Sequence, residues 1–161
     1  VRTTALPIAS AKLRQLSGHL QLVYTGKTRL ARNLLQDVLR RWYSAHPDIL
    51  NNVQALVANA RALETALYDG NVAAVGACLD TYGSQKKKMC DAEPSTVTRM
   101  LHKLRPICDG ASLAGAGGGG FMILVTKEAN ARAAVEEALS DEMCTCHDVE
   151  IHESGLQTIV G

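Results

Sequence analysis

The residues best suited to chemistry in this chain are a run of glycines, since five of the six positions from 115 to 120 are glycine. Glycine costs roughly 0.5–1 kcal/mol relative to alanine in a regular element, because it loses the most backbone freedom on folding. A folded chain keeps such a run where the backbone needs positive φ or where another group must approach closely. Backbone N–H groups of such a loop can hold an anion. The run therefore predicts a pocket for substrate or phosphate, lined by Gly115, Ala116, Gly117, Gly118, Gly119 and Gly120.

Two familiar phosphate-binding motifs resemble parts of this sequence, but neither is complete. The spacing of Gly115, Gly117 and Gly120 satisfies G-x-G-x-x-G, but that fingerprint needs a strand before it and a helix after it. Here an apolar, strand-like run follows at 121–125. Gly26-Lys27-Thr28 resembles the end of a P-loop, which would require glycine at the position of Gln21. Neither motif explains the glycine run.

A second polar segment lies at the end of a predicted strand. Thr25 offers a hydroxyl group, and Lys27 and Arg29 offer cationic donors for phosphate or sugar oxygens. Cations at a helix N-terminus oppose the helix dipole, which favours a functional role over surface charge alone. We expect Thr25, Lys27 and Arg29 to form a second contact surface of the pocket, with ordinary surface cations as the alternative.

The remaining residues show no catalytic constellation and no metal site. Cys144-x-Cys146-His147 lacks a second ligand pair at zinc spacing. Five scattered cysteines suggest free thiols in a reducing, cytoplasmic compartment. A net charge of +1 gives no reason to expect nucleic acid or membrane as a partner. The short run of lysines at 86–88 is interpreted as a solvated helix end, with a phosphate-facing lysine as the alternative.

Hydrophobic periodicity predicts strands and helices that are segregated along the chain, which is typical of an α+β fold. Residues 1–17 are weakly patterned. The predicted strands cover 20–24, 111–114 and 121–125, followed by 147–152 and 156–160, which could form one hairpin or one strand with a bulge. Helices are expected over 29–45, from 49 to a stop at Gly70, from a cap at Asn71 to 82, from a cap at Ser95 to an end at Pro106, and over 131–139. We expect a mostly antiparallel, four-stranded sheet with helices on one face.

Residues 112–121 resemble the third signature motif of the GHMP small-molecule kinases. Residues 22–31 and Gln85-Lys86-Lys87 are similar to the fucokinase branch of that superfamily. The resemblance implies a GHMP kinase C-terminal domain over 18–161, with a ferredoxin-like core and extra helices. Residues 1–17 would then be a lead-in from an N-terminal kinase domain.

The resemblance also implies an activity. An intact kinase of this branch would transfer the γ-phosphate of ATP, with Mg²⁺, to the anomeric hydroxyl of L-fucose. The nucleotide-binding and catalytic residues would lie in the N-terminal domain, which would be the partner of this chain. The chain alone would then be inactive and bind neither ATP nor Mg²⁺ tightly. Three alternatives stay open: a related heptose-phosphate or galactose-type kinase, a stand-alone anion-binding regulatory module, and a protein-interaction domain.

Overall fold

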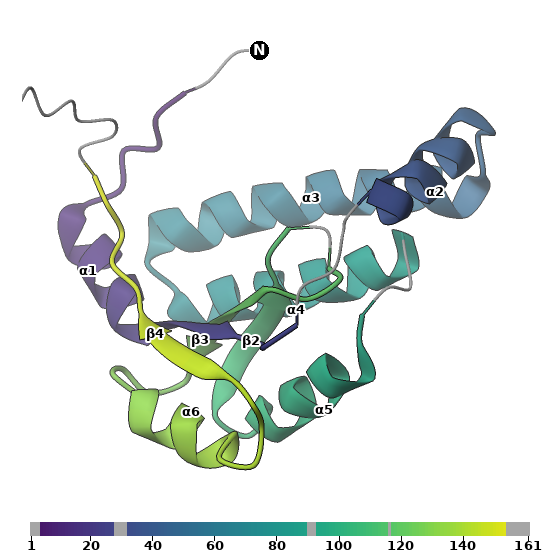
Figure 1. Ribbon diagram of the computed structural model, residues 1–161. Helices are drawn as coiled ribbons and strands as arrows, with labels where there is room; N and C mark the ends of the chain where they lie inside the picture. The colour runs from purple at the N-terminus through teal and green to yellow at the C-terminus, as the bar shows by residue number, and fades with distance from the viewer. Residues whose placement is uncertain (1–3, 28–31, 90–92, 116, 154–161) are drawn as a thin grey trace, which may run out of the picture.

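Four antiparallel strands form one sheet in the computed structural model, which describes residues 4–27, 32–89, 93–115 and 117–153 (Figure 1). The strands are β1 (Leu20–Tyr24), β2 (Cys108–Leu113), β3 (Phe121–Thr126) and β4 (Thr145–Asp148). Their spatial order is β2-β3-β1-β4, and every pairing is antiparallel. This order confirms the predicted α+β fold with its four-stranded, ferredoxin-like sheet.

Six helices accompany the sheet in the described part of the chain. They are α1 (Ser10–His19), α2 (Arg32–Tyr43), α3 (Pro47–Asp69), α4 (Val72–Met89), α5 (Ser95–Leu104) and α6 (Arg132–Ala138). Gly70 ends α3 in the left-handed conformation at φ 70°, and the Asn71 side chain accepts the Ala74 N–H at 3.0 Å, as the sequence predicts. None of these described helices combines the length and the apolar character needed to cross a membrane.

The helices cover both faces of the sheet, whereas the sequence predicted one. Helices α5 and α6 pack on one face through residues such as Met100 and Val135. Helices α1, α3 and α4 pack on the other, and Leu16 and Val75 belong to that second cluster; Figure 1 shows the two layers. The reason lies in β3, where Leu124 and Val125 point to opposite faces and are 0% and 1% exposed. A continuous apolar run of this kind fits a strand that is buried on both sides.

Several element boundaries differ from those predicted. Helix α1 lies where the sequence is weakly patterned, and it crosses the boundary drawn at residue 17. Strand β2 begins at Cys108 rather than at 111, and β4 ends at Asp148 rather than at 152. The strand predicted over 156–160 lies outside the described residues.

Helix α4 and strand β2 approach each other through two glycines. A Cβ atom added to Gly110 would lie 1.7 Å from the carbonyl oxygen of Gly76, and one added to Gly76 would lie 2.6 Å from the Asp109 Cβ. Neither distance is compatible with a side chain, so glycine at both positions lets α4 lie directly on the strand.

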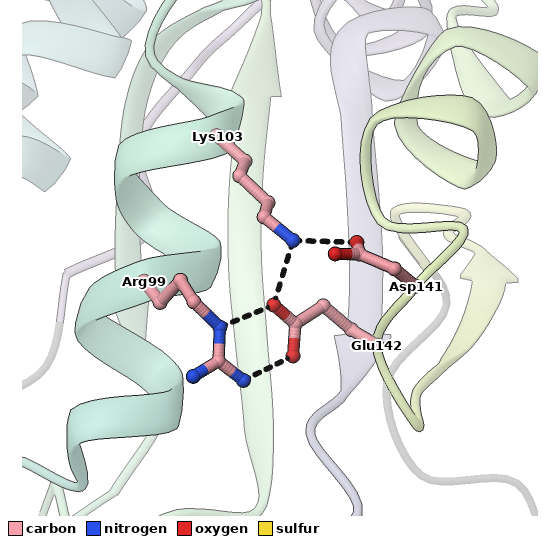
Figure 2. A network of polar contacts seen from close by, with 4 residues as sticks. All are labelled: Arg99, Lys103, Asp141 and Glu142. Atoms are coloured by element: carbon pink, nitrogen blue, oxygen red, sulfur yellow. Dashed lines mark hydrogen bonds and ion pairs between the residues drawn. The ribbon is translucent and has the colours of Figure 1, made fainter.

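A cluster of charged side chains ties α5 to the turn after α6 (Figure 2). The Arg99 guanidinium donates two hydrogen bonds of 2.7 Å to the Glu142 carboxylate. The Lys103 ammonium lies 2.8 Å from the same carboxylate and 2.5 Å from Asp141. The Glu142 side chain is only 7% exposed, and these bonds lower its pKa to about 2. Two cations therefore hold one carboxylate between the helices that cover this face.

Gly110→Ala should destabilise the protein by about 1–3 kcal/mol or more, because the new methyl group overlaps the backbone of α4. The matched control is Gly18→Ala in α1, where the added methyl group would meet only the Ala129 Cβ at 3.6 Å. Denaturant unfolding of both variants tests this, and equal stabilities would contradict the close packing of α4 on β2.

Glu142→Gln should lower stability at neutral pH and flatten its acid dependence. The folded pKa of about 2 is below the usual 4.5, so the stabilisation is fully present above pH 4.5 and is lost as pH falls toward 2. Unfolding free energies measured from pH 7 to pH 2 should therefore fall less steeply in the variant. Glu64→Gln, at an exposed position on α3, is the control and should keep the slope of the parent protein.

Candidate functional site

The glycine loop joins β2 to β3 and closes a hairpin. Its backbone is left-handed at four of the described positions, with φ of 63° at Gly115, 88° at Gly117, 128° at Gly119 and 90° at Gly120. Side chains rarely allow such angles. The glycine run is thus explained first by the conformation of the loop.

The end of the loop is fastened to the segment that follows β1. The Gly120 carbonyl accepts hydrogen bonds from the Thr25 N–H and the Thr25 hydroxyl, both at 2.9 Å. The Gly120 N–H donates to the Lys27 carbonyl at 2.6 Å. A Cβ atom on Gly119 would lie 2.8 Å from that same carbonyl oxygen. Residues 25–27 therefore clamp the loop on one side.

The structure brings most of the predicted site residues together. Gly115, Gly117, Gly118, Gly119 and Gly120 form the loop, and Thr25 and Lys27 lie against it. Thr25 is 3% exposed and its hydroxyl is bonded to Gly120, so its visible role is to hold the loop. Ala116 and Arg29 lie outside the described residues. That these residues contact a substrate or phosphate stays a prediction.

The middle of the loop offers hydrogen-bond donors. Among the described residues, the N–H groups of Gly117, Gly118 and Gly119 have no hydrogen-bond acceptor, whereas Gly120 uses its own. Consecutive backbone N–H groups can converge on an anion.

Lys86 lies beside the loop, although the sequence analysis interpreted the lysine run as a solvated helix end. The Lys86 ammonium donates to the Leu113 carbonyl at 2.6 Å and lies 5.1 Å from the centre of the Tyr82 ring. Burial lowers the pKa of Lys86, and the nearby Glu93 carboxylate partly opposes this shift. Lys87 and Lys88 are exposed, as that interpretation expected.

A groove of about 360 Å³ runs between α4, α5 and β2 and reaches the loop at Gly117. Its lining is rich in polar and charged side chains, including Ser84, Lys86, His102 and Asp109. Such a groove can hydrogen-bond a small polar ligand.

The described donors suit phosphate better than a metal ion. The loop and Lys86 offer N–H and ammonium donors, which match phosphate oxygens. No group of three or more His, Cys, Asp or Glu side chains gathers within the described ranges. Cys78, Cys108, Cys144 and Cys146 are free thiols, and burial raises the pKa of Cys108 to about 12, which makes it a poor nucleophile. Cys90 lies outside the described residues.

Comparison with known proteins identifies the family. The family model described as "GHMP kinases C terminal" matches residues 63–144, just over half of the chain. The chain belongs to the GHMP kinases, and it is a C-terminal domain of that family. The match spans α4, α5, the glycine loop and β3, so the loop lies inside the family region.

Two curated relatives resemble the GHMP domain. One is the bifunctional fucokinase/GDP-fucose pyrophosphorylase of Arabidopsis thaliana, 25% identical over 88% of this chain. The other is the L-fucokinase/L-fucose-1-P guanylyltransferase of Bacteroides fragilis, 26% identical over 74% of this chain. The chain spans only 14% and 13% of their lengths.

A solved structure confirms the fold of the GHMP domain. The crystal structure of L. major mevalonate kinase in complex with R-mevalonate superposes with a TM-score of 0.69 at 18% identity. The superposition covers 76% of this chain and 37% of that chain. At this identity, the likeness concerns the fold alone.

Gly119→Ala should loosen the clamp on the loop, because φ of 128° and the Lys27 carbonyl both exclude a methyl group. We expect a cost of about 1–3 kcal/mol and faster hydrogen exchange of the Thr25 amide. Gly115→Ala is the matched control, since its φ is also positive but no atom lies within 4 Å of the added Cβ. If both variants exchange alike at Thr25, the clamp is not what holds the loop.

Proposed function

We propose that this GHMP domain is the C-terminal part of an ATP-dependent sugar kinase that phosphorylates the anomeric hydroxyl of L-fucose, giving fucose 1-phosphate. Membership of the kinase family and the fucokinase names of two relatives support this. The observation that carries it is the glycine loop, whose end is fixed by Thr25 and Lys27 while three backbone N–H groups of its middle are unengaged within the described residues.

In this proposal, the loop stabilises charge on the transferring phosphoryl group. Phosphoryl transfer depends mainly on positioning and on electrostatic stabilisation of the phosphate oxygens. Donors that are already oriented need no rearrangement during the reaction, and this makes them effective. Gly117, Gly118 and Gly119 would donate their N–H groups to those oxygens. Lys27, exposed beside the loop, would add a positive charge, and Arg29 is proposed to do the same.

ATP and Mg²⁺ would supply the phosphoryl group and partly neutralise its charge when bound. The metal ligands and the catalytic base are proposed to lie in the part of the polypeptide that precedes this chain, as the resemblance implies. We therefore expect the 161-residue chain alone to be inactive and to bind neither ATP nor Mg²⁺ tightly.

The rest of the polypeptide is the proposed partner. Helix α2 begins shortly after the clamp segment and exposes Leu35, Leu39 and Trp42, which share one helix face by their spacing. Large exposed apolar side chains that gather in this way commonly mark contact surfaces. An N-terminal kinase domain resting on this face would close the site over the loop. A cytoplasmic location, where ATP is available, is part of the same proposal.

Gly118→Val in the full-length polypeptide should lower kcat for L-fucose by about 100-fold or more. The branched side chain at this buried position would turn the N–H donors of the loop away from the phosphate, and losing one oriented donor costs about that much. Gly118 is buried in the loop, so the thermal midpoint is measured alongside activity. The control is Gly18→Ala in α1. Galactose and a heptose phosphate are assayed in parallel. If the parent protein prefers either of them, that sugar and not fucose is the substrate. Activity of Gly118→Val near the parent level would refute the role of the loop.

A further inference from the structure

We propose that Lys86 is a phosphate ligand of this site and that its ammonium group binds the γ-phosphoryl oxygens of the nucleotide together with the glycine loop. The inference rests on the proposed kinase function and adds a residue to it. It concerns one of three consecutive lysines in α4, which the sequence does not distinguish from one another.

Three observations place the Lys86 ammonium beside the loop. It donates to the Leu113 carbonyl, the last residue of β2, at 2.6 Å. It lies over the Tyr82 ring at 5.1 Å from the ring centre. It is also 3.8 Å from the point where a Cβ atom on Gly117 would stand. The side chain is half-buried, so its position is set by its surroundings.

This position lets Lys86 and the loop share one ligand. Hydrogen bonds from nitrogen to oxygen are about 2.7–3.2 Å long, so two donors to one oxygen can stand up to about 6 Å apart. The Lys86 ammonium lies 3.8 Å from the Cβ position of Gly117, so the N–H group of Gly117 lies close to this range. An ammonium has three N–H donors. Leu113 takes one of them, which leaves two that can turn toward a phosphate.

Lys86 adds a full positive charge to the loop, besides that of the exposed Lys27. Backbone N–H groups contribute only partial charges, whereas a γ-phosphoryl group carries negative charge on each of its oxygens. Burying a cation is costly unless it is paired. Lys87 forms a 2.7 Å ion pair with Glu93, and Lys88 is exposed, so neither is placed as Lys86 is. A phosphate at the loop would complete the pairing of the half-buried ammonium.

Ligand protection in the full-length protein tests this without any mutation. The protein is treated with an amine-acetylating reagent alone, with ATP plus Mg²⁺, or with ADP plus Mg²⁺, and each lysine is followed by mass spectrometry. We expect ATP to slow the modification of Lys86 at least fivefold, ADP to slow it less than twofold, and Lys88 to be unaffected. Equal effects of ATP and ADP on Lys86, or no protection, would overturn the assignment.

Three variants provide a second, independent test. Lys86→Met in the full-length protein should lower kcat/KM for ATP at least tenfold while leaving ADP affinity within twofold. Lys88→Met removes the same charge two residues away and should behave as the parent. Lys86→Arg, which keeps the charge, should recover part of the loss and serves if the methionine variant fails to fold. If Lys86→Met matches Lys88→Met, or if it weakens ADP as strongly as ATP, the inference fails.

The two proposals fail in different ways. If the parent protein phosphorylates fucose and Gly118→Val does not, but Lys86 behaves as Lys88, only the present inference is lost. If Gly118→Val is fully active, or no sugar is phosphorylated, the proposed function is lost, whereas selective protection of Lys86 by ATP would still establish it as a phosphate ligand.

Discussion

Helix α4 lies so close to strand β2 that a methyl group on Gly76 or Gly110 would not fit, and the position of the candidate site follows from this contact. The helix and the strand run side by side from this point, since Gly83 lies next to Ser112 and Lys86 reaches Leu113. Along α4, the ten residues from Gly76 to Lys86 rise about 15 Å. Along β2, the three residues from Gly110 to Leu113 extend about 10 Å. The backbone of α4 at Lys86 and the end of β2 at Leu113 therefore lie at similar distances from the glycine contact. The long lysine side chain spans the remaining gap and reaches the start of the glycine loop.

The loop has two sides with different tasks. On one side, Thr25 and Lys27 use the polar groups of Gly120 completely, and the buried hydroxyl of Thr25 adds a bond that a residue without a hydroxyl, such as alanine, could not make. On the other side, the middle glycines keep their donors unengaged within the described residues. A loop of glycines would otherwise sample many conformations. The clamp reduces this freedom, so that the donors keep one orientation.

Local signals in the sequence were sufficient for much of this fold. The strand at 20–24, the stop at Gly70, the cap at Asn71 and the glycine loop could each be recognised from neighbouring residues. Helix α1 could not, because its few apolar residues, such as Leu16, form too weak a stripe and it is stabilised by tertiary packing. The position of Lys86 beside the loop could not be singled out either, although a phosphate-facing lysine in the run at 86–88 was the alternative interpretation. Successive residues of a helix point about 100° apart, so only the packing of α4 on β2 shows which of three lysines faces the loop.

In the proposed kinase, the same contacts limit what a second domain would have to provide. The loop is shaped by groups within this chain, namely Thr25, Lys27 and the α4–β2 contact that places Lys86. A second domain would therefore not need to fold the loop, and its binding energy could be used to place nucleotide and acceptor. Donors fixed before the substrate arrives also avoid the cost of reorientation in the transition state. In the proposed kinase, the cost of fixing a glycine-rich backbone would therefore be met during folding by the contacts of Thr25 and Lys27, rather than during each catalytic cycle by the substrate.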